Sequence, residues 1–193
     1  MNTIKVDKRD FTRKPKQLRR SGIVPGNVFG GTLETPVSLQ MPEATASRLF
    51  RDLREGSRLQ LDLEGQILPV QIKEKSINTL NGEILHISFQ ALKADQKVNS
   101  VIHILLENAE KLTKPVEKML MEIPYASLPG DMIDTITIDM DGMAVGTILT
   151  VGDIPELKSD RLEVKVDPDE IVLRISDKTA GPAPVAEETV EEA

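Results

Sequence analysis

The sequence predicts a mainly β protein built from two domains and an acidic tail, and three observations support this. Short segments of alternating or β-branched residues recur along the chain, and glycine or proline separates them. The charge changes sign near the middle: residues 1–94 hold 15 Lys and Arg against 10 Asp and Glu, whereas residues 95–193 hold 9 against 21. Residues 179–193 contain no basic residue, four Glu and two Pro, which is typical of disorder. We therefore expect domains at residues 1–94 and 95–178, followed by a disordered acidic tail.

The first domain is expected to contain five or six strands and two helices within about 90 residues, a combination that fits a small β-barrel. Each strand combines β-branched or alternating apolar residues with a turn residue at its end. The clearest pair alternates with a period of two on both sides of a tight turn at Glu64 and Gly65. In chain order, the predicted strands are residues 2–6, 24–29, 35–41, 57–63, 67–75 and 83–90.

Two helices are expected between these strands. The first is short and basic; Pro15 suits its first turn, where a missing N–H costs nothing, and Gly22 lies just past its end. The second begins at Pro42, ends at Gly56 and has leucines four residues apart, so that one of its faces is apolar.

The second domain is expected to be an all-β unit. The β pattern continues there, and proline and glycine separate the further strand candidates. The change in charge places the junction between the domains at residues 91–97. The predicted strands of this domain are residues 99–106, 118–124, 134–140, 146–151, 161–166 and 170–175.

The most distinctive stretch is residues 13–30, which joins a cluster of cations to a strand interrupted by glycine. Five cations lie within eight residues, with no acid among them. The strand that follows would hold the basic helix rigidly, and it ends at the aromatic Phe29. Cations clustered beside a fixed aromatic residue indicate binding of a phosphate-rich partner. The five cations are Arg13, Lys14, Lys16, Arg19 and Arg20.

Each of these residues also has a purely structural interpretation. A run of charge can be a solvated helix face, and Phe29 can belong to the core instead of stacking on a base. His86 is alone within a predicted strand and can be a structural hydrogen-bonding group. For His103, in the other half, we expect only that structural role. The residues by themselves leave the alternatives for Phe29 and His86 open.

Signals for catalysis, metals and cofactors are poor, so we expect neither an enzyme nor a small-molecule substrate. The chain has two His and no Cys, which excludes disulfides and thiolate metal sites. It lacks the P-loop, nucleophile-elbow and zinc-protease motifs. Asp139 and Asp141 stand in a DMDG sequence without the spacing or the final Glu of a calcium loop.

The sequence also predicts where the protein acts. Its amino terminus has no apolar region of the kind found in secretory signals. No segment reaches the roughly 18 apolar residues that a membrane helix needs. We therefore expect a cytoplasmic protein with no membrane contact.

With these motifs in place, the chain resembles bacterial large-subunit ribosomal protein twenty-five in its long, two-domain form, the general stress protein Ctc type. The resemblance covers residues 1–178 and is most specific in the pattern LRR-x-G-x-x-P-G-x-V-aromatic at residues 18–29. The strand ending His-x-x-Phe at residues 86–89 is the second match. Residues 129–146 and the DPDE sequence at residues 167–170 match more loosely.

The resemblance implies a six-stranded amino-terminal barrel that sits on 5S rRNA, a second all-β domain and a tail that is commonly acidic. It also implies similarity of the barrel to the anticodon-binding region of glutaminyl-tRNA synthetase. Carried over residue by residue, it implies a set of RNA-binding residues. They are Arg9, Lys14, Lys16, Arg19, Arg20, Phe29, Lys73, Glu74, His86 and Ser88.

Two of these positions depart from the family pattern. Phe29 stands where the family usually has Tyr, so a stacking face is kept and a hydroxyl donor is lost. Ser88 stands where the family usually has Asp, so a negative charge is lost. Losing one charge-assisted hydrogen bond costs roughly 1.5–3 kcal/mol. We therefore expect weaker or altered recognition of 5S rRNA, with the basic cluster retained.

The leading hypothesis is a non-catalytic protein of the 50S ribosomal subunit whose partners are 5S rRNA and neighbouring ribosomal proteins. An alternative is a stress-linked protein-interaction module with weakened RNA binding, which the departures at Phe29 and Ser88 motivate. A third is a tRNA binder of the anticodon type, which rests on the similarity of the barrel alone.

Overall fold

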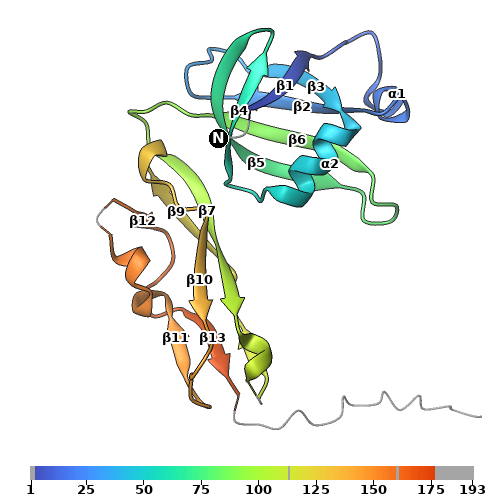
Figure 1. The fold of residues 1–193 in the computed structure, drawn as a ribbon. Helices are drawn as coiled ribbons and strands as arrows, with labels where there is room; N and C mark the ends of the chain where they lie inside the picture. The colour runs from blue at the N-terminus through green and yellow to red at the C-terminus, as the bar shows by residue number, and fades with distance from the viewer. Residues whose placement is uncertain (1–2, 113, 160, 177–193) are drawn as a thin grey trace, which may run out of the picture.

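The computed structural model describes residues 3–112, 114–159 and 161–176, so the predicted tail at residues 179–193 lies outside the described residues. Two β-rich domains follow one another along the chain, and the second extends away from the first (Figure 1). The predicted fold class is confirmed for the described residues: a closed barrel with two helices is followed by a second β domain.

The first domain is a closed six-stranded barrel. Its strands are β1 (Thr3–Lys8), β2 (Ile23–Phe29), β3 (Val37–Pro42), β4 (Arg58–Leu63), β5 (Gln66–Ile77) and β6 (Ile84–Ala91). Around the barrel they follow the order β1-β3-β2-β6-β5-β4, and β1 closes the sheet by pairing parallel with β4. β2 pairs antiparallel with β3 and parallel with β6, which is far away in the sequence. A closed barrel leaves no sheet edge exposed.

Alternation along each strand decides which side chains fill the barrel. The inward positions hold Val, Leu, Ile and Met, together with Phe89, and each of these side chains is at most 7% exposed. Gly26 occupies an inward position of β2 where a Cβ atom would lie 2.7 Å from the Ile87 carbonyl oxygen of β6. These two strands can therefore approach one another only because this residue lacks a side chain.

Two helices lie against the barrel, α1 (Pro15–Arg20) and α2 (Glu43–Asp52). The features that predicted α1 are present: Pro15 is in its first turn, and Gly22 has a φ of +74° just past its end. α1 buries Leu18, and α2 packs Ala46 and Leu49 into the barrel core.

The predicted end of α2 at Gly56 is wrong, because the helix ends at Asp52. Leu53 already has an extended backbone, and the Lys75 ammonium of β5 donates to the Leu53 carbonyl oxygen at 2.7 Å. A side chain from a distant strand thus satisfies a carbonyl group that the end of the helix leaves free. Gly56, with a φ of +85°, instead lets the next turn approach the second domain, where its Cβ would lie 2.6 Å from Ser100 Oγ.

The second domain contains two small sheets. Its strands are β7 (Val98–Glu107), β8 (Val116–Lys118), β9 (Glu122–Ser127), β10 (Thr135–Asp139), β11 (Ile148–Thr150), β12 (Glu163–Val164) and β13 (Ile171–Ile175). One sheet has the order β10-β7-β9-β12 and the other β11-β13-β8. Within the described residues, four short 3-10 helices lie between these strands: η1 (Ala109–Lys111), η2 (Pro129–Asp131), η3 (Val151–Asp153) and η4 (Pro155–Lys158). A separate core joins the two sheets, with Ile102, Ile123 and Tyr125 each 0% exposed.

The prediction of one strand at residues 118–124 is wrong. That segment is divided between β8 and β9, which belong to different sheets. The amides of Met119 and Leu120 both donate to the Val172 carbonyl oxygen at 3.0 Å, so the chain leaves one sheet there. Met121 then accepts a hydrogen bond from the Ile104 amide in the other sheet. The apolar sequence KMLMEIP conceals this crossing because both sheets bury the same kinds of side chain.

The close approach at Gly26 generates a stability prediction. Gly26→Ala should lower the free energy of unfolding by about 1–3 kcal/mol, the usual range for overpacking a core. The added methyl group would meet the Ile87 carbonyl oxygen at 2.7 Å and Leu39 Cδ1 at 2.9 Å. Gly130→Ala is the matched control, because a Cβ atom there meets nothing within 4 Å. Urea unfolding measures both variants, and equal stabilities would contradict the barrel geometry described here.

Candidate nucleic-acid interface

One row of outward residues crosses the barrel and joins positions that are far apart in the sequence. Ser38 on β3 pairs with Asn27 on β2, Asn27 pairs with Ser88 on β6, and Ser88 pairs with Glu74 on β5. Arg9, just after β1, donates its amide to the Ser38 carbonyl oxygen at 3.0 Å and ends the row. Three predicted residues, Arg9, Glu74 and Ser88, thus lie together on the outer side of the barrel, which we name the outer face; Ser88 is only 9% exposed there.

Asn27 is a candidate residue that the sequence analysis missed. Its Oδ1 atom is buried and has no hydrogen-bond partner among the described residues. Buried polar atoms normally have partners, so this oxygen is an unsatisfied acceptor beside Ser88 on the outer face. The alternation of β2 was the available signal: Gly26 and Val28 on either side of Asn27 are buried, which places Asn27 on the outside.

A second row begins at Phe29 and continues to the second domain. Phe29 is half-buried and lies outside the barrel core, so its interpretation as a core residue is wrong. It pairs with Gln90 on β6, and Gln90 Oε1 accepts a 2.9 Å hydrogen bond from Gln71 Nε2 on β5. Gln71 Nε2 also donates to the Asn99 carbonyl oxygen of β7, as does the Lys73 ammonium at 3.2 Å. Lys73 is therefore at the junction between the domains, at the end of the outer face.

His86 lies on the outer face beside Ser88, whose Oγ is 3.4 Å from His86 Nδ1. Burial lowers the pKa of His86 below its ordinary value of 6.5; Glu74 opposes this shift, and the Arg9 cation adds to it. His86 is therefore neutral at pH 7, with one ring nitrogen that donates and one that accepts. It offers a partner hydrogen bonds instead of a positive charge.

The basic helix has one anchored cation and several free ones. Arg19 Nε donates to Glu83 Oε1 at 2.8 Å, and its side chain is only 18% exposed. No acid lies among the five cations in the sequence, but Glu83 reaches Arg19 from the β5–β6 loop and neutralises it. The hydrogen bond from Arg19 lowers the pKa of Glu83. Lys14, Lys16 and Arg20 are exposed, so their charges face solvent.

The loop between β1 and α1 also carries cations. The Arg9 guanidinium lies 5.5 Å from the centre of the Phe11 ring, and its Nε atom is buried without a partner among the described residues. Arg13 lies 3.8 Å from Asp10 and is largely exposed. Because the Arg9 amide donates to the Ser38 carbonyl oxygen of β3, this loop adjoins the outer face.

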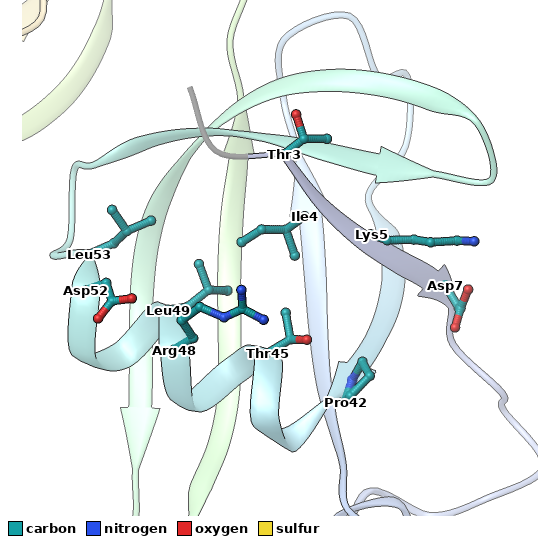
Figure 2. Close-up of a pocket in the computed structure, with 10 residues that line it drawn as sticks. All are labelled: Thr3, Ile4, Lys5, Asp7, Pro42, Thr45, Arg48, Leu49, Asp52 and Leu53. Atoms are coloured by element: carbon teal, nitrogen blue, oxygen red, sulfur yellow. The ribbon is translucent and has the colours of Figure 1, made fainter.

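A groove of about 730 Å³ lies between β1 and α2. Figure 2 shows Ile4 projecting from β1 toward the helix that forms the other wall. None of the lining residues belongs to the predicted RNA-binding set. Phosphate and base contacts can be made on an open surface, so such a set needs no deep pocket. The groove is lined by Thr3, Ile4, Lys5, Asp7, Pro42, Thr45, Arg48, Leu49, Asp52 and Leu53.

The described residues contain no group of three or more His, Asp or Glu side chains placed to hold a metal ion. None of the helices within them combines the length and apolar character required to span a bilayer.

The chain is similar to known proteins along nearly its whole length. The Ribosomal L25p family matches residues 4–89, and the family described as ribosomal protein TL5, C-terminal domain, matches residues 97–179. The large ribosomal subunit protein bL25 of Bacillus pumilus is 28% identical, over 100% of this chain and 94% of its own length. The protein of the same name from Akkermansia muciniphila is 29% identical, over 92% of this chain and 90% of its own length.

The surroundings of His86 predict its titration. Its ring signals, followed by NMR as a function of pH, should give a midpoint below 6.5, because burial disfavours the protonated ring. Glu74→Gln should lower the midpoint further, and Arg9→Gln should raise it, since these charges act in opposite directions. A midpoint at or above 6.5, or shifts of the reverse sign, would contradict this arrangement.

The same shift has a consequence for stability. The pKa of this histidine is lower in the folded state than in the unfolded state, where it is about 6.5. The neutral ring therefore contributes its full stability above about pH 6.5. That stability is lost as the pH falls through the pKa of the folded state. The urea midpoint of the protein should therefore fall less steeply between pH 7 and pH 5 in His86→Gln than in the wild type.

Proposed function

Because the chain belongs to the long, two-domain form of the bacterial ribosomal L25p family, and is thus a structural, non-enzymatic protein of the large ribosomal subunit, we propose that its barrel binds 5S rRNA. Membership confirms the resemblance seen in the sequence. The observation that supports RNA binding most directly is the meeting of the basic helix with the outer face. Arg19 bonds Glu83 shortly before β6, and His86 follows on that strand.

In this proposal the exposed cations of α1 supply affinity by contacting phosphates. Lys14, Lys16 and Arg20 are exposed and form no ion pair among the described residues, so they can release the counterions condensed on RNA. Arg19 holds α1 against the β5–β6 loop and keeps these cations in fixed positions. Affinity should consequently fall steeply as salt is added.

The outer face supplies local recognition. Phe29 presents an aromatic ring on which an unstacked base can lie, and the half-buried Asn27 side chain can turn its unpaired oxygen toward the RNA. Neutral His86 and Ser88 can donate to or accept from base edges and ribose hydroxyl groups. Glu74 is the one acid among the predicted RNA-binding residues, and its charge repels phosphates. The RNA backbone should therefore pass on the side of the outer face that adjoins the basic helix.

The shape of the partner follows from these contacts. The major groove of a regular A-form helix is too narrow for side chains to read, so the target should be a bent or bulged helix of 5S rRNA. Contacts with neighbouring ribosomal proteins and a cytoplasmic location are parts of the same proposal. A protein-interaction module and a tRNA binder, the two alternatives, give different results in the following experiment.

The test compares phosphate-contacting and anchoring roles in α1. Arg19→Ala combined with Arg20→Ala should weaken binding of 5S rRNA at least tenfold, which is about 1.4 kcal/mol, and should reduce its salt dependence. Glu83→Gln tests the anchoring role separately, because it breaks the ion pair but keeps every cation, so it should leave the salt dependence of binding that of the wild type. Gel shifts across a salt series, with tRNA as competitor, give the measurement. Unchanged affinity of the double variant at moderate salt, or equal competition by tRNA, would count against 5S rRNA.

Asn27 provides a separate test of the outer face. Asn27→Ala should weaken binding of 5S rRNA about threefold to tenfold, since one neutral hydrogen bond contributes roughly 0.5–1.5 kcal/mol. The slope of affinity against salt should stay that of the wild type, because no charge is removed. Thr137→Ala on the exposed side of β10 is the control. The role of Asn27 is refuted if both variants bind equally well.

A further inference from the structure

Two lysines from different domains converge on one asparagine. The Lys73 ammonium of β5 lies 3.2 Å from the Asn99 carbonyl oxygen, and the Lys165 ammonium lies 2.8 Å from Asn99 Oδ1. Both bonds end on the same residue, so two positive charges are held near one another. Asn99 is neutral and cannot balance these two charges, so the arrangement attracts an anion.

Among the described residues, neither lysine forms an ion pair. Two acids stand two residues from Lys165 in the sequence. The carboxylate of Glu163 is bonded to Lys97 at 3.1 Å, and Asp167 Oδ1 accepts a hydrogen bond from the Asp169 amide at 3.1 Å. Lys73 has Glu74 beside it in the sequence, but Glu74 bonds Ser76 at 3.1 Å. The two ammonium groups therefore keep donors available that the protein does not satisfy, since each carries three.

The surrounding backbone holds the lysines in place. The Lys165 amide donates to the Pro124 carbonyl oxygen of β9 at 2.9 Å, which fixes the chain just after β12. Gln71, which is 0% exposed, donates to the Asn99 carbonyl oxygen at 3.1 Å and ties Asn99 to the barrel. A site held by strands in this way loses little entropy when a ligand binds.

The pair of lysines continues the outer face. Gln71 bonds both Asn99 and Gln90, and Gln90 pairs with Phe29 on β2. RNA that contacts Phe29 would therefore have its backbone close to the junction between the domains. A carboxylate of a protein could also meet two lysines, but the continuity with the outer face favours the RNA backbone.

We propose that Lys73 and Lys165 form a phosphate-binding site across the domain junction, oriented by Asn99, and that it takes a backbone phosphate of the 5S rRNA held by the barrel. This inference rests on the proposed function. It gives the second domain a direct contact with the RNA. It also explains why Asn99 is held by Gln71 from the barrel and by Lys165 from its own domain.

Lys165 is the residue to change, because its bond to Asn99 lies within the second domain and leaves the contacts of Lys73 and Gln71 intact. Lys165→Gln in the full chain should weaken 5S rRNA binding threefold to tenfold and lower the salt slope by about the value for one phosphate contact, 0.7–0.9. Lys165→Arg should restore both, because it keeps the charge. Lys118→Gln, at an exposed position of β8, is the matched control and should bind like the wild type.

The same assay includes the Arg19→Ala and Arg20→Ala double variant, which separates the two proposals. If the double variant loses affinity while Lys165→Gln binds like Lys118→Gln, the junction site is overturned and the barrel proposal stands. If the wild type does not bind 5S rRNA, both are overturned. Loss of affinity in Lys165→Gln with an unchanged salt slope would show that no phosphate is contacted, and would also overturn the site.

Discussion

The parallel pairing of β2 with β6 is the contact on which both the barrel and its outer face depend. Gly26 permits it, because a Cβ atom would lie 2.7 Å from the Ile87 carbonyl oxygen. The register that follows sets Asn27 opposite Ser88 and Phe29 opposite Gln90. A shift by one residue would turn these side chains into the core, so burial of the inner face also fixes the composition of the outer face.

The cations and the neutral polar groups have different physical tasks. Arg19 is bonded to Glu83 and orients α1, while its exposed neighbours keep their charge for a partner. On the outer face, burial keeps His86 neutral, so recognition there depends on hydrogen bonds and stacking. The basic helix thus offers charge and the adjoining outer face offers hydrogen bonds and stacking, on neighbouring parts of one surface.

A polar seam joins the second domain to the barrel. His103 is 7% exposed, and its Nε2 lies 2.8 Å from the Glu55 carbonyl oxygen, in agreement with the structural role expected for it. Arg58 donates to the Pro129 carbonyl oxygen at 2.8 Å on the same seam. Directional bonds of this kind orient one domain on the other, and this orientation brings Lys165 to the end of the outer face.

The sequence by itself determined the mainly β class, the two helices and the basic segment, because alternation, Pro15 and Gly22 act within a few residues. Apolar character alone could not separate β8 from β9, since both sheets bury similar side chains. Only the tertiary structure decided that Arg19 meets Glu83, that Asn27 faces outward beside Ser88, and that Lys73 reaches Asn99. These contacts depend on strand register in a closed barrel, which joins residues that no local pattern connects.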